Sequence, residues 1–279
     1  MNPEDLICFI GTYFKENKEA SKDIIDGYLN SDAMTIDNDM FIEMAPTILY
    51  SLYNFIVSSD HVPELIKNRV IEKENDFTAL TVELIYIWTH GAIPLTFSWE
   101  RSSKEFYRRI LVPIRFNLSD IMYGALSTMR SQMSEMVYLE SGDYAFVSGK
   151  EYQDGDDYTY LASDYAAYAI YHLQDARMCY GYDDAWVFTI SLNHMRILDD
   201  KLAHEPLVLI DAAGFGIFEG NQENVLIALG DPMVKANSSF NAKDMLGVDF
   251  TKVNIPDIKA NLEESFYLTQ YRYEAKEEL

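Results

Sequence analysis

The chain has 279 residues, of which 48% are hydrophobic and 24% charged, enough apolar content for one large domain or two smaller ones. Its 45 acidic and 22 basic residues give a formal net charge of −23. This excess of negative charge argues against binding along a nucleic-acid backbone or an anionic membrane surface, because both need clustered Lys and Arg. The composition is typical of a soluble, globular protein.

Cysteine usage and hydropathy favour a location inside the cell. Only two cysteines occur, Cys8 and Cys179, which excludes a disulfide framework. The N-terminal sequence is acidic where a signal peptide would be basic, and the longest apolar stretch, residues 84–97, is interrupted by polar residues. We therefore expect a cytoplasmic protein with no membrane-spanning helix.

The first ninety residues have the periodicity of helices. Apolar residues recur at helical spacing from Leu6 to Phe14, and further helices are expected at about residues 40–57, 63–74 and 77–89. Pro46 falls inside the second of these, which predicts a helix start or a kink near Ala45. Residues 1–91 are therefore expected to form an α-helical N-terminal segment.

After Gly91 the pattern changes to that of strands. Strands are expected at residues 92–99, 106–112, 136–139, 144–147, 186–192 and 207–210. Asn117 or Ser119 is a good N-cap for a helix reaching about residue 130, a short helix is expected at 223–229, and the tail from about 256 reads as helical. Residues 92–279 should thus form an α+β body with a mixed or antiparallel sheet, flanking helices and a helical acidic tail.

Three sequence blocks of this body form a recognisable pattern. They are FYRRILVP at residues 106–113 with NLSDI at 117–121, YGYDDAWVF at 180–188 and GFGIFEGN at 214–221. In order and spacing they resemble the plasmid pRiA4b ORF-three-like family, a poorly understood group carried by bacterial plasmids, phages and other mobile elements, over roughly residues 93–262. The matching positions are Arg108, Arg109, Pro113, Tyr180, Tyr182, Asp184, Trp186, Gly214, Gly216 and Glu219.

The chain also departs from the family pattern. Where the family usually has Trp, Gly, Asp or His, this sequence has Tyr107, Gly220, Gln222 and Phe188. The histidine that would suit a metal or proton-transfer role is thus replaced by Phe188, which shares a strand face with Trp186 and is expected to pack there. The resemblance implies carriage by a mobile element, and no residue chemistry here supports recombination.

One basic cluster interrupts the acidic sequence, formed by Arg101, Lys104, Arg108, Arg109 and Arg115. One interpretation is an anion or phosphate site, because guanidinium groups bind phosphate bidentately. The other is that these residues offset neighbouring acids through ion pairs on the sheet. Arg108 and Arg109 are adjacent on a strand and point to opposite faces, so they cannot grip one phosphate together.

No metal, cofactor or catalytic motif is expected. Asp154, Asp156 and Asp157 surround a glycine but lack the register of a calcium-binding loop, so we interpret them as a solvated turn. The five histidines and two cysteines show no metal-ligand spacing. The glycine-rich segment at 214–216 lacks the Lys and the Ser or Thr of a phosphate-binding loop, and no nucleophile elbow occurs.

Tyrosine is unusually frequent, with 20 residues, and several fall beside the acidic loop. Tyrosine is enriched at protein interfaces because it offers a rigid contact area with a polar tip. The alternative is ordinary packing of amphipathic rings over a sheet. The predicted interface residues are Tyr152, Asp154, Asp156, Asp157, Tyr158, Tyr160, Tyr165 and Tyr168.

Two hypotheses of different classes follow. The first is a non-enzymatic, acidic protein-interaction module of a phage or mobile element, which binds a host or element-encoded protein with a basic surface and inhibits it, including by mimicking nucleic acid. The alternative is an enzyme or binding protein for a phosphorylated small molecule, in which Arg108 or Arg109 holds the anion and Asp184 and Glu219 are the acid–base candidates. Direct DNA binding ranks last because of the net charge.

Overall fold

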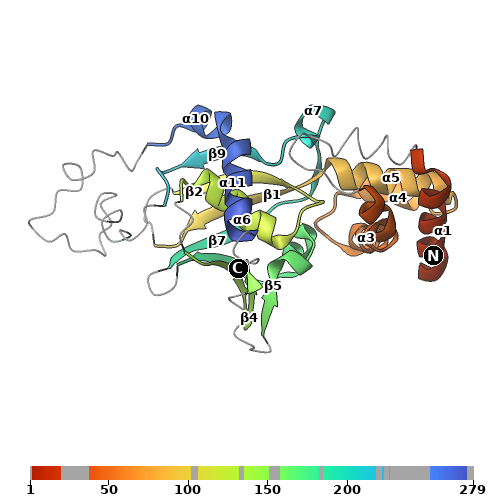
Figure 1. The fold of residues 1–279 in the computed structure, drawn as a ribbon, viewed down its shortest axis with the longest axis horizontal. Helices are drawn as coiled ribbons and strands as arrows, with labels where there is room; N and C mark the ends of the chain where they lie inside the picture. Colours follow the sequence, from red (N-terminus) through yellow and green to blue (C-terminus); the bar gives the residue numbers. More distant parts are fainter. Residues whose placement is uncertain are drawn as a thin grey trace, which may run out of the picture. The chain divides into compact units, whose positions relative to one another are not determined.

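The computed structural model describes residues 2–19, 38–101, 106–131, 135–150, 158–181, 185–217, 222, 226 and 252–274. The chain divides into two compact units, which are described separately (Figure 1). The helical unit comprises Met1–Ile93, Pro113–Arg115 and Asn193–Glu205, and the sheet unit comprises Pro94–Val112, Phe116–Leu192 and Pro206–Leu279. None of the helices within the described ranges is both long and apolar enough to cross a bilayer.

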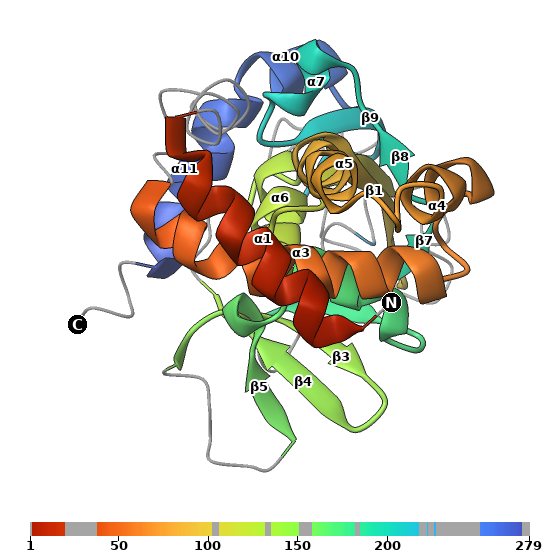
Figure 2. The same cartoon turned by 90° about the vertical axis from the view of Figure 1, so that its right-hand side faces the viewer.

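The helical unit is built from five described helices, and α1 lies along α3 (Figure 2). These are α1 (Pro3–Glu16), α3 (Asn38–Ser58), α4 (Glu64–Ile71), α5 (Phe77–His90) and the single-turn α7 (Asp200–Ala203). The helices expected from periodicity are present. Helix α3 runs through Pro46 instead of starting there, so the proline lies inside the helix.

Side chains at helical spacing form the core of this unit. Leu6, Ile10 and Phe14 lie on one face of α1 and are buried, as are Leu49 and Leu52 of α3. Helix α1 is capped by the Asn2 side chain, which accepts the backbone N–H of Glu4 at 3.1 Å, and Asp76 caps α5 in the same way. Apolar burial and end capping together explain why these segments fold as helices.

The sheet unit is a mixed, mostly antiparallel sheet with helices, so the fold class is α+β as expected from the sequence. Its strands are β1 (Gly91–Trp99), β2 (Tyr107–Pro113), β3 (Val137–Ser141), β4 (Tyr144–Val147), β5 (Thr159–Leu161), β6 (Arg177–Tyr180), β7 (Trp186–Leu192) and β9 (Val208–Ala213). The strand order is β5-β4-β3-β6-β7-β1-β2-β9, and β4 and β5 are the parallel pair. The two-residue β8 (Arg196–Ile197) pairs with Gly91 and Ala92 at the start of β1, and these four residues belong to the helical unit.

One face of the sheet is packed and the other carries polar side chains. Helix α6 (Leu118–Thr128) is buried throughout, and α11 (Leu262–Glu274) packs on it, as Figure 1 shows. Asn117 and Asp120 form a capping box at the start of α6, which confirms the predicted N-cap. The ring of Phe266 in α11 stacks on Phe116 with centroids 5.5 Å apart.

Short elements complete the sheet unit, namely the 3₁₀ turns η2 (Ala162–Asp164) and η3 (Ala167–His172) and the helix α10 (Ile255–Ala260). The helical tail is present as α10 and α11. The short helix expected at 223–229 lies outside the described residues apart from Leu226.

Candidate functional site

Arg108 is a fully buried cation whose five hydrogen bonds all go to backbone carbonyls. Its Nε–H donates to the carbonyl of Thr128 at 2.8 Å. One terminal nitrogen donates to the carbonyls of Tyr107 and Ala213 at 2.8 and 2.7 Å, and the other donates to those of Gly214 and Phe215 at 3.0 and 2.9 Å. A guanidinium has five N–H donors, and all five are used.

This geometry gives Arg108 a structural role. Burial lowers its pKa to about 10, with a smaller effect from the nearby charge of Arg130, so the side chain is still protonated at neutral pH. It joins the end of α6, the start of β2 and the segment after β9. Because none of its donors is left for an anion, Arg108 cannot act as the phosphate-binding residue that the alternative hypothesis assigned to it.

Arg109 lies on the opposite face of the strand, as the alternation predicted. It is exposed, and its guanidinium lies over the ring of Tyr107 at 5.8 Å. Asp211 of β9 pairs with Arg109 in the ladder and accepts a hydrogen bond from the Tyr107 hydroxyl at 2.7 Å. That hydrogen bond, with a smaller contribution from Arg109, lowers the pKa of Asp211. Arg109 therefore sits beside an ionised carboxylate, as in the charge-offsetting interpretation.

The three sequence blocks meet at one end of the sheet. Phe106 lies 6.3 Å from Trp186 and 6.0 Å from Phe188 between ring centroids, and Phe188 is fully buried, as expected for a packing residue. The Trp99 ring lies 4.4 Å from that of Trp186 between centroids, tilted by 31°. Gln222 donates to the carbonyl of Ala185 at 3.0 Å, and Arg101 donates to Gln222. Packing and hydrogen bonds thus account for these motif positions.

The two motif glycines are required by the backbone. Gly216 has a φ of 150°, and a Cβ there would lie 2.2 Å from the carbonyl oxygen of Met129. Gly214 has a φ of 74°, and its Cβ would meet the Phe106 ring at 2.6 Å. The segment also donates the Ile217 N–H to the carbonyl of Met129 at 2.8 Å. Gly216 thus lets the chain pass closely over the end of α6, and Gly214 lets it pass closely over the Phe106 ring.

Some of the remaining motif positions lie in described strands, and the others lie outside the described residues. Tyr180 is buried in β6, and its hydroxyl accepts the backbone N–H of Glu135 at 3.3 Å. Pro113 ends β2. The motif positions Tyr182, Asp184 and Glu219 lie outside the described residues, as does Lys104 of the basic cluster.

An aromatic cluster lies at the other end of the strand order. Tyr144 and Phe146 of β4 face Tyr158 and Tyr160, and Tyr165 closes the group. The ring centroids are 6.0 Å apart for Tyr144 and Tyr158, 5.9 Å for Tyr144 and Tyr160, and 5.7 Å for Phe146 and Tyr160. Tyr165 meets Phe146 edge-on at 5.2 Å. We call these five residues the aromatic cluster.

The cluster extends from the core to the surface. Phe146 is buried, Tyr160 and Tyr165 are half-buried, and the side chains of Tyr144 and Tyr158 are 47% and 53% exposed. Three of the predicted interface tyrosines are therefore brought together with Tyr144 and Phe146, which the sequence reasoning missed. The sequence predicts residues 144–147 only as a strand. The pairing of this strand with β5 is what places Tyr144 and Phe146 beside the three tyrosines.

The other predicted interface residues do not join this surface. Tyr168 lies in η3 and is only 9% exposed, because it packs into the core of the sheet unit. Its assignment to an exposed interface is therefore wrong. Tyr152, Asp154, Asp156 and Asp157 lie outside the described residues.

The polar face of the sheet has an open hollow of about 500 Å³. Glu100, Glu140, Arg177 and Thr189 line it. Arg177 pairs with Glu140 at 2.8 Å and approaches Glu100 to 4.0 Å. Asp175 also lines the hollow, so its three carboxylates outnumber the single cation Arg177 and the hollow keeps a net negative charge.

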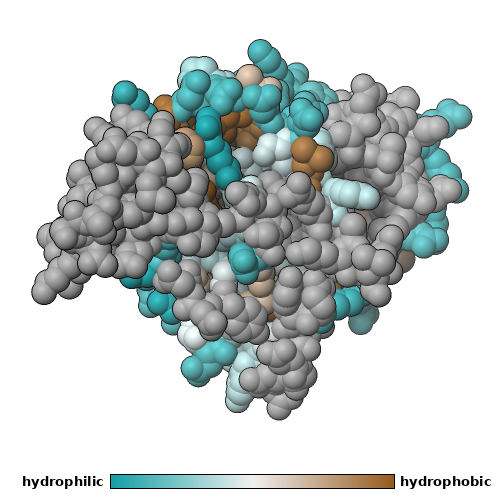
Figure 3. Space-filling view, turned by 60° about the vertical axis from the view of Figure 1, so that its left-hand side comes forward, coloured by the Kyte–Doolittle hydropathy of each residue, from teal (hydrophilic) through white to brown (hydrophobic). Residues whose placement is uncertain are grey.

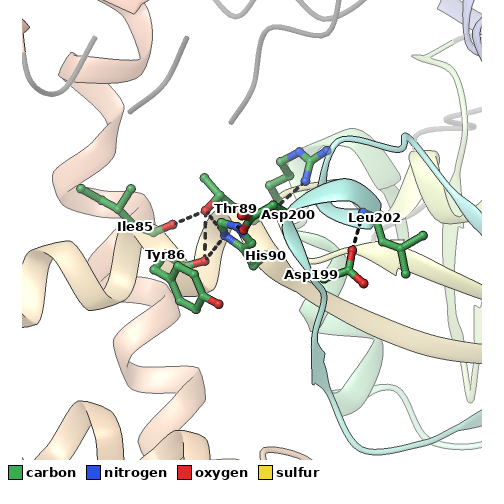
Figure 4. Close-up of polar contacts among 8 residues, drawn as sticks. Ile85, Tyr86, Thr89, His90, Asp199, Asp200 and Leu202 are labelled. Carbon is green, nitrogen blue, oxygen red and sulfur yellow. Dashed lines mark hydrogen bonds and ion pairs between the residues drawn. The ribbon is translucent and has the colours of Figure 1, made fainter. Parts of the chain in front are cut away.

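A buried histidine joins two elements of the helical unit (Figure 4). His90 at the end of α5 stacks on Tyr86 at 4.2 Å. Its Nδ1 lies 2.8 Å from the Thr89 hydroxyl and 3.1 Å from the carbonyl of Tyr86, and its Nε2 lies 3.3 Å from a carboxylate oxygen of Asp200 in α7. Thr89 is buried and its hydroxyl bonds the carbonyl of Ile85, so it is not placed as a nucleophile.

A second polar group of the helical unit is an ion cluster. Glu83 of α5 is buried and pairs with Arg69 at 2.7 Å and with Lys73. Arg69 also lies 5.2 Å from the ring of Tyr86. Across the ranges that the structure describes, no three His, Cys, Asp or Glu side chains are grouped so as to hold a metal ion.

Comparison with known proteins adds a fold likeness. No protein-family model matches the chain, and no curated protein matches it. Among solved structures, the chain is similar to the crystal structure of MM3350, a protein of unknown function from Methanosarcina mazei Go1, with 14% identity and a TM-score of 0.49. The match covers 60% of this chain and 97% of that one. Because that protein has no known function, the likeness identifies no activity.

Proposed function

We propose that this protein is a non-enzymatic, acidic interaction module that binds a basic partner protein through the aromatic cluster. The observation that carries this proposal is the half-exposed pair Tyr144 and Tyr158 on a cluster anchored by buried Phe146. Tyrosines fixed by packing lose little side-chain entropy on binding, and their hydroxyls stay available for hydrogen bonds. In this proposal the partner is a host or mobile-element protein in the cytoplasm, and binding inhibits it.

Electrostatics support a basic partner. The net charge of −23 creates a field that attracts positive surfaces. From Asp143 to Tyr165 the sequence has six acidic residues and one lysine. Where described residues are visible in Figure 3, the surface is mainly hydrophilic with small hydrophobic areas. A partner held by steering and by tyrosine contacts fits these features.

The competing hypothesis of a phosphorylated small molecule loses one of its two anion-binding residues. Arg108 uses all its donors on carbonyls, and Arg109 lies beside the carboxylate of Asp211. A phosphate placed there would be repelled by that carboxylate. We therefore favour the protein-interaction proposal.

The test compares proteins captured from a bacterial lysate by the wild-type chain and by a Tyr144→Ser, Tyr158→Ser double variant. We expect a stoichiometric partner that the wild type retains and the double variant loses. We also expect raising the salt from about 50 to about 500 mM to release it, since exposed charges are screened. The matched control is Tyr271→Ser, which alters a 70% exposed tyrosine of α11 outside the cluster.

Capture that is the same for wild type and double variant would contradict the role of the cluster. Capture that is unchanged across the salt series would contradict the basic character of the partner. The control variant must retain whatever the wild type retains. Thermal unfolding of each variant shows whether a loss of capture comes from loss of the fold.

A further inference from the structure

Among the strands that the structure describes, β5 is at one edge of the sheet. It pairs with β4 and is the last strand in the order on that side. Its three residues, Thr159–Leu161, precede the 3₁₀ turn that starts at Ala162. Figure 2 shows β5 beside β4, with no other labelled strand beyond it. An edge strand is a template for pairing with another chain unless something blocks it.

The ladder determines which backbone groups face outward. Ala145 is opposite Thr159 and donates its N–H to the carbonyl of Tyr158 at 3.0 Å. In a parallel ladder, alternate residues of a strand direct both backbone groups to the same neighbour. Tyr160 therefore bonds toward β4, and the N–H and C=O groups of Thr159 and Leu161 point to the outer edge.

The aromatic cluster lies alongside this edge. Tyr158 and Tyr160 belong to the same strand face, two residues apart, and their rings contact Tyr144 and Phe146. A strand added to β5 would place its side chains on that face about 5 Å from the tyrosines. Arg or Lys side chains there would lie over tyrosine rings, which attract cations.

The negative charge around this edge favours a basic segment over a second copy of the chain. Asp143 and Asp164 are exposed at the two ends of the β4–β5 region, within a segment that is acidic in sequence. A second copy of this chain would bring two charges of −23 together, which disfavours self-pairing. A segment rich in Arg or Lys gains from the same field.

We propose that the outer edge of β5 binds an extended, basic segment of the partner as an added strand, with its cationic side chains over Tyr158 and Tyr160. This rests on the proposed function and gives its binding mode. Backbone hydrogen bonds of Thr159 and Leu161 hold the segment, and the tyrosines select its positive charge. A three-residue edge offers few such bonds, so the affinity of an isolated segment is low.

The decisive probe is a fluorescent peptide, Arg-Thr-Arg-Val-Arg-Thr-Arg, titrated against the full chain at low salt. Two methylated versions keep its charge. One carries N-methyl groups on the arginine amides and the other on the Thr and Val amides. Amides of alternate residues point to opposite edges of a strand. We expect one methylated version to bind at least about tenfold more weakly than the plain peptide, and the other to bind like it.

A matched pair of protein variants tests the same edge. Thr159→Pro removes an outward N–H without removing a bond to β4, and edge strands accept proline. We expect it to weaken binding of the plain peptide about tenfold, and Thr159→Ala, which keeps the N–H, to stay within about twofold. Thermal unfolding checks both variants. If the proline variant does not fold, the peptide comparison decides alone.

Three results would overturn the inference. The first is equal binding of all three peptides, and the second is no binding of the plain peptide. The third is a wild-type dimer in sedimentation that Thr159→Pro converts to a monomer, because the occupant of the edge would then be a second copy of the chain. The first two leave the proposed function standing if the tyrosine double variant still loses its captured partner. If the wild type and the tyrosine double variant capture the same partner equally, the proposed function is refuted instead.

Discussion

Arg108 donates its Nε–H to the carbonyl of Thr128, the last residue of α6, at 2.8 Å. None of its five hydrogen-bond partners is a carboxylate. The negative end of the α6 dipole and four further carbonyls stabilise the buried charge instead. Met129, the next residue, has its carbonyl taken by the Ile217 N–H. The end of α6 is thus satisfied by segments that are distant in sequence.

The first prediction concerns this cation. Arg108→Lys is expected to lower the free energy of unfolding by about 3 kcal/mol or more, because an ammonium has three donors on a single atom and leaves buried carbonyls unpaired. Urea unfolding followed by circular dichroism measures the change. Arg109→Lys on the exposed face is the control, with an expected change within about 0.5 kcal/mol. Equal effects of the two variants would contradict the assignment.

Longer elements of the fold could be predicted because local signals agree with the tertiary structure. The alternation from Trp186 to Leu192 gives β7, and Asn117 gives the cap of α6. Strands β5, β6 and β8 and helix α7 were missed, because in segments of two to four residues periodicity is a weak signal, although the four-residue β4 was predicted. Pairing with neighbouring strands, or packing on α5 for α7, stabilises them.

The sites were predictable to a lesser degree. The alternation predicted that Arg108 and Arg109 lie on opposite faces of the strand. The carbonyls that Arg108 binds, at residues 128 and 213–215, come together only through tertiary contacts. Tyr168 was misassigned because it lies three residues after Tyr165 in a tyrosine-rich stretch, whereas its side chain turns inward in a 3₁₀ turn. The aromatic cluster needed the β4–β5 pairing, which joins residues more than ten positions apart.

The second prediction concerns Gly216. Gly216→Ala is expected to destabilise the sheet unit by about 3 kcal/mol or more, because its φ of 150° and the 2.2 Å approach to the Met129 oxygen exclude a Cβ. Gly142→Asn is the control. Gly142 has a φ of 59° with no atom within 4 Å of a Cβ, and asparagine tolerates that conformation. Its expected cost is below about 1 kcal/mol. A well-tolerated Gly216→Ala would show that the segment after β9 can move away from α6.

The third prediction separates the partners in the His90 group. His90→Ala is expected to cost about 2 to 4 kcal/mol of unfolding free energy, because it removes a buried ring stacked on Tyr86 and leaves a cavity. Asp200→Asn should cost less than about 1 kcal/mol, because the Asp200 side chain is 86% exposed and water screens the contact. Urea unfolding of both variants gives the comparison. An Asp200→Asn cost as large as that of His90→Ala would mean that the contact is shielded from water.

The last prediction uses the two cysteines as matched probes. Cys179 is buried, and burial, with a smaller effect from Glu140, raises its pKa to about 12, whereas Cys8 is exposed. At pH 8 we expect a thiol-reactive dye to label one thiol quickly in the native chain and two after denaturation, because the thiolate is the reactive form.

The same shift predicts how the stability contributed by Cys179 depends on pH. In the unfolded chain the Cys179 thiol ionises near its ordinary pKa of 9.0, while in the folded chain it keeps its proton up to about 12. The folded state therefore binds more protons in that window, and its stability falls as pH rises through it. The free energy of unfolding, measured with urea at pH 8 and pH 10, should fall less between these two values for Cys179→Ala than for the wild type. Cys8→Ala should behave like the wild type. Rapid labelling of two thiols in the native chain would contradict the burial of Cys179. The same fall in unfolding free energy between pH 8 and pH 10 in all three proteins would contradict it as well.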